Sequence, residues 1–367
     1  MCAHSLYLRP LGLVPFSAKP SDTGFSGLLP LCGGMPFGFS ALEIIKRDGV
    51  RIERRRAALA EIWDSDAGGA YLAAGDILDR LTLPRRRIAG LSLERPQIMG
   101  VVNVTPDSFS DGGLLADTKA AVTLGLRLAA EGASIIDIGG ESTRPGSDAT
   151  PIAVELERVI PVIEELVART DALISIDTRK AEVMHRAIRA GAGMINDISA
   201  LSHDPDALPA AAESDLPVCL MHALGDPKTM QDDPRYVDVL TDVYDTLAGR
   251  MAACAEAGIP RERILVDPGI GFGKTFAHNL DLLSGLTLFH GLGCPILLGA
   301  SRKRLTGVIS GEKEAGKRVL GSVGAALAGA AQGVQVVRVH DVKETRQALD
   351  VFMASLLGIH DGEPALA

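Results

Sequence analysis

Residues 97–146 read QIMGVVNVTPDSFSDGGLLADTKAAVTLGLRLAAEGASIIDIGGESTRPG, and this stretch contains the pattern that decides the fold. It opens with an almost continuous apolar run at residues 98–104, which predicts a strand buried on both faces. A polar loop follows, then an Ala- and Leu-rich segment with helical spacing at residues 117–131, then a second apolar run at residues 134–138. One strand–helix unit thus leads directly into another strand, which is typical of a parallel α/β sheet.

The same unit recurs along the rest of the chain. Apolar runs that predict strands occupy residues 98–104, 134–138, 173–176, 193–198, 217–221, 264–266, 295–298 and 335–339. Segments with helical periodicity occupy residues 117–131, 151–168, 179–190, 204–213, 234–257, 277–289, 317–331 and 342–357. Eight strand–helix units over about 260 residues match the size of a (β/α)8 TIM barrel, the α/β fold that we predict. An open doubly wound sheet is the alternative, but polar clusters follow the ends of many different strands, which share one face only in a barrel.

Residues 1–95 lack this alternation, and we treat them as an N-terminal extension to a barrel domain at residues 96–360. Residues 21–40 are rich in Gly, Pro and Phe, whereas residues 41–64 are charged and show some helical periodicity. We therefore expect at least one helix around residues 41–61. The extension could be a small subdomain, a segment packed on the barrel or a partly disordered arm.

The composition of the chain excludes several classes of protein. Hydrophobic residues make up 47% of the chain and charged residues 23%, which is typical of a soluble globular protein with a large core. A net charge of −9 argues against a nucleic-acid partner, and no apolar run is long enough to span a membrane. The five cysteines are scattered and odd in number, which favours neither a disulfide framework nor a zinc site and fits a reducing cytoplasm.

Polar loops follow the first two predicted strands. The first loop, NVTPDSFSDGG at residues 103–113, carries Asn103 and Asp111, and its length indicates a mobile lid or a ligand clamp rather than an ordinary connection. The second loop carries Thr143 and Arg144 behind a pair of glycines. Arginine suits fork-like binding of phosphate oxygens, although a salt bridge between Glu141 and Arg144 is the simpler alternative.

An acid and an amide end the third and fourth predicted strands. Asp177 and Asn196 should point side by side into the barrel mouth, because neighbouring parallel strands end at the same face. A carboxylate accepts hydrogen bonds from ring N–H groups, and an amide both donates and accepts, so this pair suits recognition of a heterocycle edge. Capping of the following helix is the alternative role for such an Asp.

A glycine-rich loop follows the sixth predicted strand. It reads DPGIGFGKT at residues 267–275, begins with Asp267 and presents Phe272. A nucleotide-binding P-loop requires a glycine one residue earlier than this sequence provides, so we exclude an ATPase. We interpret the segment as a carboxylate at a strand end followed by a flexible loop that presents an aromatic ring.

Basic residues gather at the last two predicted strands. Lys303 follows the seventh strand, close to Ser301, and Arg338 and His340 lie at the eighth. Barrels frequently bind phosphate at these strands, although an isolated basic cluster can also be a solvated rim. Carboxylates and an amide on the middle strands, with cations on the closing strands, fit a ligand with a nitrogen-rich ring at one end and phosphate at the other.

Taken together, these motifs resemble the dihydropteroate synthase family. The resemblance rests on residues 99–113, 141–146, Asp177, Asn196, Met221-His222, and residues 226–231, 267–274, 301–303 and 338–340. It covers residues 97–357 in order, and its motifs are specific, whereas nothing before residue 95 matches the family pattern.

The resemblance implies a reaction, a metal and a set of site residues. Enzymes of this family join a dihydropterin methyl diphosphate to 4-aminobenzoate, are typically homodimers and use Mg²⁺. The implied ligands are Asp177, Asn196, Asp267, Lys303 and Met221 for the pterin, Asn103, Arg144, Arg338 and His340 for the diphosphate, and Thr143, Phe272 and Ser301 for 4-aminobenzoate. The implied catalytic residues are Asp177, Lys303 and Asp111, and the implied metal ligand is Asn103.

Two other functions share parts of this pattern. A methyltetrahydrofolate:corrinoid methyltransferase would have the same barrel and the same pterin-binding carboxylates, but it would not need the diphosphate-binding cations. A pterin-binding protein without activity would keep the binding residues and form no product.

Overall fold

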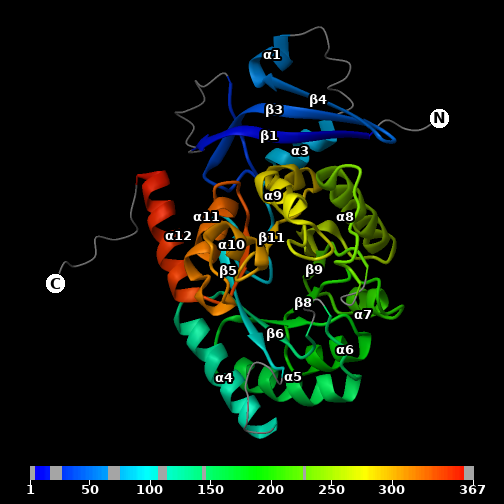
Figure 1. Cartoon of the computed structure of the whole chain (residues 1–367), viewed down its shortest axis with the longest axis vertical. Helices are drawn as coiled ribbons and strands as arrows, with labels where there is room; N and C mark the ends of the chain where they lie inside the picture. The colour runs from blue at the N-terminus through cyan, green and yellow to red at the C-terminus, as the bar shows by residue number, and fades with distance from the viewer. Residues whose placement is uncertain are drawn as a thin grey trace, which may run out of the picture.

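The computed structural model describes residues 5–16, 27–64, 75–105, 114–142, 146–225 and 229–358, and it confirms the predicted barrel (Figure 1). The strands of the barrel are β5 (Gln97–Asn103), β6 (Ile135–Gly139), β7 (Leu173–Asp177), β8 (Met194–Asp197), β9 (Val218–Met221), β10 (Ile264–Asp267), β11 (Leu297–Leu298) and β12 (Val336–Val339). They form one parallel sheet in the order β10-β9-β8-β7-β6-β5-β12-β11. A parallel bridge between Val266 and Ile296 joins β10 to the residues just before β11 and closes the ring.

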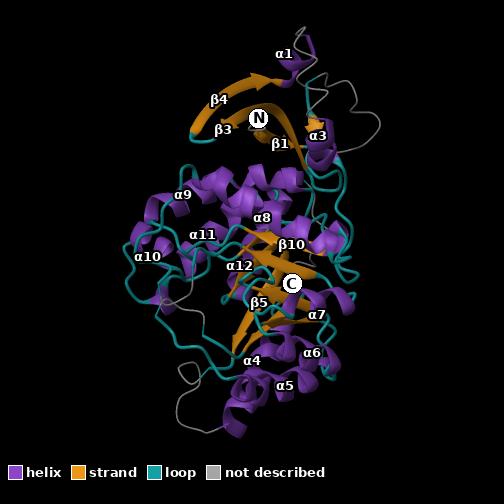
Figure 2. Cartoon of the chain, turned by 90° about the vertical axis from the view of Figure 1, so that its right-hand side faces the viewer, coloured by secondary structure: helices purple, strands orange, loops and turns teal. Residues whose placement is uncertain are grey.

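Helices follow the strands in the predicted alternation and surround the barrel (Figure 2). They are α4 (Leu114–Ala130), α5 (Ile152–Val167), α6 (Ala181–Arg189), α7 (Ala207–Glu213), α8 (Val239–Glu256), α9 (Phe276–Ser284), α10 (Arg304–Ser310), α11 (Val319–Ala330) and α12 (Val342–Leu357). No helix within the described ranges combines the length and the hydropathy that crossing a bilayer requires.

One expected helix is shorter than the sequence pattern indicated. We expected a helix at residues 277–289, but α9 ends at Ser284 and a 3-10 helix, η3 (Leu286–Leu292), follows. Gly285 separates the two because it packs against α8, where an added Cβ would lie 2.5 Å from Leu240. The contact with a neighbouring helix therefore sets this boundary.

Two apolar layers hold the barrel together. The interior contains one side chain from nearly every strand, including Met99, Ile135, Met194 and Leu265, all essentially inaccessible to solvent. The second layer lies between the strands and the surrounding helices. Near-continuous burial on both strand faces is the reason that the strand sequences are apolar runs rather than alternating patterns.

The N-terminal segment forms an antiparallel sheet, which we call the N-terminal sheet. Its strands are β1 (Ser5–Pro15), β2 (Leu29–Pro30), β3 (Phe37–Asp48) and β4 (Arg51–Ala58), and β3 pairs with each of the other three. Two short helices, α1 (Leu59–Asp64) and α3 (Gly75–Thr82), follow the strands in the chain.

Our prediction of a helix around residues 41–61 is wrong for most of that range. The residues form β3 and β4, joined by a two-residue turn in which Gly49 has a φ of +60°, a conformation that glycine adopts without strain. Pairing of β3 with β1 along its whole length outweighs the weak helical periodicity, because both faces of β3 bury apolar side chains.

The N-terminal sheet packs on the barrel beside α8, α9 and η3, as both views show (Figures 1 and 2). Tyr7 of β1 donates a hydrogen bond to the Asp245 carboxylate of α8 at 2.8 Å, and its ring meets Tyr244 edge-on at 5.3 Å. Tyr7 and Ile45 belong to the same apolar cluster as the barrel helices. The sheet and the barrel thus share a core.

Because of this shared core, Ile45→Ala should lower the free energy of unfolding of the whole chain. Ile45 is fully buried, and truncation of such a side chain costs about 2–5 kcal/mol. Urea unfolding should show a single transition at a lower midpoint, while Val50→Ala, at an 81% exposed turn position, should leave the midpoint unchanged. A separate early transition with an unchanged barrel midpoint would contradict the shared core.

Candidate active site

Strand register places four adjacent strand ends at one level of the barrel mouth. Asn103 of β5 pairs with Gly139 of β6, Gly139 with Asp177 of β7, and Asp177 with Asn196 of β8. Since Gly139 has no side chain, Asn103 Oδ1 and Asp177 Oδ2 lie within 3.5 Å and 3.6 Å of the position that its Cβ would take. The expected juxtaposition of Asp177 and Asn196 is confirmed.

A buried charge network, which the sequence did not reveal, lies just below this level. Arg338 of β12 donates from Nε to Asp137 Oδ2 at 2.6 Å and from Nη2 to Asp177 Oδ2 at 2.7 Å. Asn196 donates to the same Asp137 oxygen at 2.9 Å. Asp137 is fully buried, and its Oδ1 has no hydrogen-bond partner within the described part of the chain. The available signal was a carboxylate in the middle of the apolar run 135–139.

Burial controls the protonation of Asp177. It raises the pKa of the Asp177 carboxyl to about 7, and the Arg338 guanidinium opposes this rise while Asp137 adds to it. The Arg338 guanidinium therefore favours the charged form of Asp177, which burial disfavours, and such a shifted carboxylate is typical of a functional site.

A second acid–base pair lies at the ends of β10 and β11. Asp267 Oδ2 and Lys303 Nζ lie 3.6 Å and 3.9 Å from the position that a Cβ on Gly299 would take, so the missing side chain leaves them room to converge. Burial lowers the pKa of Lys303 to about 8 and raises that of Asp267, and each charge opposes the shift of the other. Lys303 also donates to the Ile270 carbonyl and lies 4.6 Å from the centroid of the Phe272 ring.

Residues 267–275, which we call the glycine loop, are fixed by one of their own side chains, the buried Lys274. Lys274 Nζ lies 2.9 Å from His222 Nδ1 and donates to the carbonyls of His222 and Phe272 at 3.2 Å and 2.8 Å. Burial, together with the charge of Lys274, lowers the pKa of His222 to about 3, so the ring stays neutral. Burial also lowers the pKa of Lys274 well below its ordinary value, and the Asp267 carboxylate opposes this shift. Gly269, with a φ of +68°, could not carry a Cβ, which would lie 1.9 Å from the His222 carbonyl oxygen. Neither Lys274 nor His222 had a role that could be predicted from its position in the sequence.

The closing strands bring Ser301 and His340 together. Ser301 Oγ lies 3.0 Å from His340 Nδ1 and accepts a hydrogen bond from the His340 backbone N–H at 3.2 Å. Ser301, His340 and Arg338 therefore lie on neighbouring strand ends, where we expected an anion site. Met221 is the last residue of β9 and pairs in register with Asp267, the last residue of β10.

The loop after β6 is anchored at both ends by Glu141. Its carboxylate accepts from Thr150 N at 2.8 Å, from Arg179 Nε at 2.9 Å and from Lys180 Nζ at 3.1 Å. These bonds tie residues 141 and 150 together across the loop. Three expected site residues, Asp111, Thr143 and Arg144, lie outside the described residues, and so do residues 106–113 of the lid expected at residues 103–113.

Comparison with known proteins shows which protein family the chain resembles. Residues 99–340 match the pterin-binding enzyme family. The dihydropteroate synthase of Escherichia coli K12 is 48% identical over 266 residues, which cover 72% of this chain and 94% of that protein. A structure of the Xanthomonas albilineans dihydropteroate synthase with 4-aminobenzoic acid is 52% identical, with a TM-score of 0.69, and covers 73% of this chain and 96% of that one.

A third relative gives the same result. The Yersinia pestis dihydropteroate synthase in a sulfonamide drug complex is 48% identical, with a TM-score of 0.69, over 72% of this chain and 96% of that one. The fold and the site thus define a pterin-binding enzyme built on a parallel barrel. Within this class, the chain belongs to the dihydropteroate synthase family.

The buried network predicts a pH-dependent defect for Arg338→Met. Without the cation, Asp137 and Asp177 share a buried site unpaired, which costs about 3–5 kcal/mol where both are charged. The folded-state pKa of Asp177 is already raised, so stability is greatest when the group is protonated and is lost as the pH rises through that pKa. Urea unfolding of the variant should therefore show a larger loss at pH 8 than at pH 5.5.

The control for this experiment is Arg169→Met, which removes an exposed ion pair with Glu165 on α5. That variant should match the wild-type protein at both pH values. An equal loss at pH 5.5 and pH 8 for Arg338→Met would show that the guanidinium does not hold the charge of Asp177.

Proposed function

We propose that this dihydropteroate synthase binds (7,8-dihydropterin-6-yl)methyl diphosphate in the barrel mouth, between Asp177 and Asn196 on one side and Asp267 and Lys303 on the other. The observation that carries this placement is the convergence of two raised-pKa carboxylates, an amide and a lysine at one face. The edge of a pterin ring carries ring N–H and amino groups that donate hydrogen bonds to the carboxylates. The amide both donates and accepts, so it can bind the donors and the acceptors of this edge. Met221 supplies apolar contact to the ring.

The diphosphate end of the substrate lies toward the closing strands. Arg338 uses Nε and Nη2 for the two carboxylates, and its Nη1 has no partner among the described residues, so this nitrogen is available to phosphate oxygens. His340 is two residues after Arg338, so its side chain lies on the same side of the chain and adds a second donor. Arg144, from the loop after β6, completes the set, as the family resemblance implies.

The reaction is a dissociative substitution at the pterin methylene. The C–O bond breaks, the diphosphate leaves with the electron pair, and a cation develops on the methylene carbon. Asp177 stabilises this cation electrostatically from a fixed position in a buried site, where such stabilisation is strongest. The amino nitrogen of 4-aminobenzoate then forms the C–N bond and loses a proton.

We place 4-aminobenzoate against the glycine loop. Lys303 approaches the Phe272 ring, and Ser301 lies two residues before Lys303 in the chain. Thr143 belongs to the same pocket by resemblance. The Xanthomonas albilineans enzyme has been solved with 4-aminobenzoic acid and with 7,8-dihydropteroate, which supports both substrates. Asp111, in the loop after β5, would close over them.

Asn103 would hold Mg²⁺ through its side-chain oxygen. Its half-buried carboxamide has no hydrogen-bond partner within the described residues, and an amide oxygen suits this hard cation. The described residues contain no cluster of three His, Cys, Asp or Glu side chains able to bind a metal, which fits an ion held mainly by water and substrate phosphates. When bound, Mg²⁺ would neutralise charge on the departing diphosphate.

A homodimer in a reducing cytoplasm is the assembly that we propose. Adjacent helices α10, α11 and α12 expose Val308, Ile309, Leu320 and Val351 at 54%, 60%, 85% and 70%. Exposed apolar residues on adjacent helices of a barrel favour burial against a second copy. The cysteines in the described ranges are buried and unpaired, which suits a reducing compartment.

A condensation assay tests the function and the metal together. The purified protein should form dihydropteroate and diphosphate in equal amounts from the two substrates, and only with Mg²⁺. Asn103→Ala should raise the half-saturating Mg²⁺ concentration by about tenfold, because a ligand is lost, while pterin binding without metal should not change. Unchanged metal dependence would refute the ligand role, and pterin binding without product would favour an inactive pterin-binding protein.

Asp177→Asn should separate catalysis from binding. The amide retains hydrogen-bonding capacity but lacks the charge that stabilises the methylene cation, so kcat should fall by about 100-fold. Affinity for the pterin substrate, measured by calorimetry, should fall far less. Equal losses in turnover and affinity would remove the charge-stabilising role.

A further inference from the structure

The glycine loop is linked to the N-terminal sheet by consecutive side-chain contacts, and we propose that the sheet positions this loop for 4-aminobenzoate. Tyr236, Asp238 and Arg54 are the positioning residues in this proposal. It rests on the proposed placement of 4-aminobenzoate against Phe272.

Tyr236 makes the first link. Its hydroxyl donates to the Gly273 carbonyl at 2.7 Å, immediately after Phe272 in the chain. Its ring meets His278 edge-on at 4.9 Å, and His278 belongs to the capping box that starts α9 at the end of the glycine loop. Tyr236 therefore contacts both the loop and the helix that follows it.

The start of α8 determines where Tyr236 lies. Asp238 is the N-cap residue, and its carboxylate accepts from Thr241 N at 3.0 Å. The Asp242 carboxylate accepts from Val237 N at 2.8 Å and from Asp238 N at 3.2 Å. Two carboxylates thus fix the backbone of residues 236–238 just before the helix.

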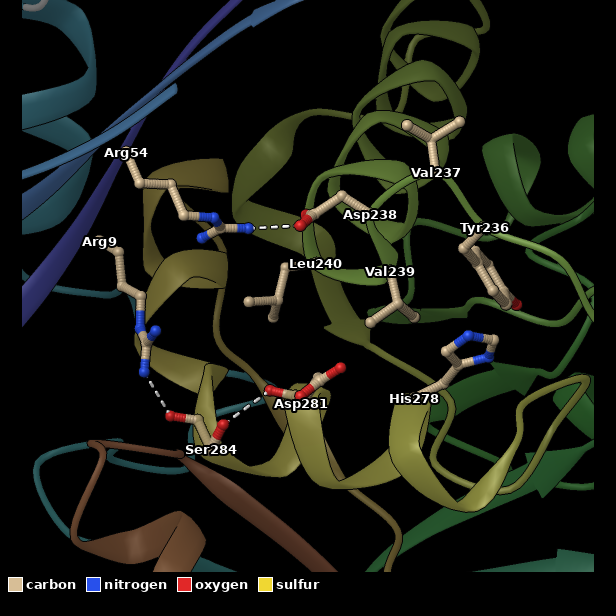
Figure 3. Close-up of a pocket in the computed structure, with 10 residues that line it drawn as sticks. All are labelled: Arg9, Arg54, Tyr236, Val237, Asp238, Val239, Leu240, His278, Asp281 and Ser284. Carbon is tan, nitrogen blue, oxygen red and sulfur yellow. Dashed lines mark hydrogen bonds and ion pairs between the residues drawn. The ribbon is translucent and has the colours of Figure 1, made fainter. Parts of the chain in front are cut away.

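Two arginines of the N-terminal sheet bind those same carboxylates. Arg47 of β3 donates to Asp242 Oδ1 at 2.6 Å, and Arg54 of β4 pairs with Asp238 Oδ2. Figure 3 shows Arg54 reaching from the N-terminal strands to Asp238, with Tyr236 and His278 farther from the sheet. All four residues line a cavity of about 400 Å³. Both arginines are less than one-third exposed, so solvent screens these ion pairs less than fully exposed ones.

The N-terminal sheet lies outside the part of the chain shared with the relatives. The family match begins at residue 99, and the Escherichia coli enzyme aligns over 94% of its own length while covering 72% of this chain. The sheet is therefore an addition to the family core. Its arginines contact the segment that leads from the start of α8 through Tyr236 to the glycine loop, and this contact is the basis of the proposed role in the reaction.

A double-mutant cycle on Arg54 and Asp238 tests this proposal. Asp238→Asn removes the ion pair but keeps a good N-cap, so α8 should retain its start. We expect Arg54→Ala and Asp238→Asn each to raise the KM for 4-aminobenzoate by about threefold, and the double variant to do no more than either. Tyr236→Phe should raise it by about fivefold, as the loss of one hydrogen bond predicts. The kcat and the affinity for the pterin substrate should stay within about twofold.

Amide hydrogen exchange supplies a readout that does not depend on turnover. The amides of residues 269–274 should exchange faster in Arg54→Ala and Asp238→Asn than in the wild-type protein. Arg51→Ala is the matched control, because Arg51 is on the same strand, is 78% exposed and pairs only with Glu53 among the described residues. It should change neither exchange nor KM.

An unchanged KM for 4-aminobenzoate in Arg54→Ala and Tyr236→Phe, with or without faster amide exchange, would overturn the proposal. A lower melting temperature as the only effect of these variants would overturn it as well. The last result would make the sheet a stabilising element with no influence on the loop. If the wild-type protein formed no dihydropteroate, the proposed function would fail on its own, and exchange in residues 269–274 would decide whether the sheet positions the loop.

Discussion

Closure of the parallel barrel is the constraint on which the active site depends. It places β12 beside β5, so Arg338 reaches Asp137 and Asp177, which precede it by 201 and 161 residues. Three charged side chains are thereby buried together in a region of low dielectric constant, where each is tolerated only because the others are present. A sheet with these strands in chain order, and without pairing of β12 to β5, would leave the cation at one edge and the carboxylates in the middle. The buried network therefore depends on the pairing of the last barrel strand but one in the sheet order, β12, with the first barrel strand in the chain, β5.

Glycines determine how closely the functional groups approach one another. Gly139 and Gly299 lie at strand ends where a side chain would fill the space between the reacting groups, and each is flanked by a carboxylate from a neighbouring strand. Gly269 allows the glycine loop to turn directly over the carbonyl of His222. The buried amino group of Lys274 then holds that turn through three contacts with residues of two different loops. Glycine allows the tight backbone turn, and the contacts of one buried lysine side chain then hold the turn in place.

The N-terminal sheet shows how an added segment can join an existing enzyme core. It shares apolar residues with the helices around the barrel, and its arginines pair with carboxylates that already cap and orient α8. Carboxylates near a helix N-terminus are stabilising without a partner, because they interact with the free N–H groups of the first turn. An arginine on a neighbouring surface needs only to reach such a site to become connected to the loop beyond it.

The sequence alone indicated the barrel, the family and the face at which the candidate site residues gather, because buried parallel strands require apolar runs and polar residues at strand ends meet at one face. Asp177 and Asn196 were predicted as neighbours because adjacent strands in a barrel end together. The sequence did not show that residues 41–58 form strands, because their conformation depends on pairing with β1. It also did not show that Asp137 and Arg338 share a buried network. Partners so far apart in the chain leave no local pattern, and long-range pairing decides both features.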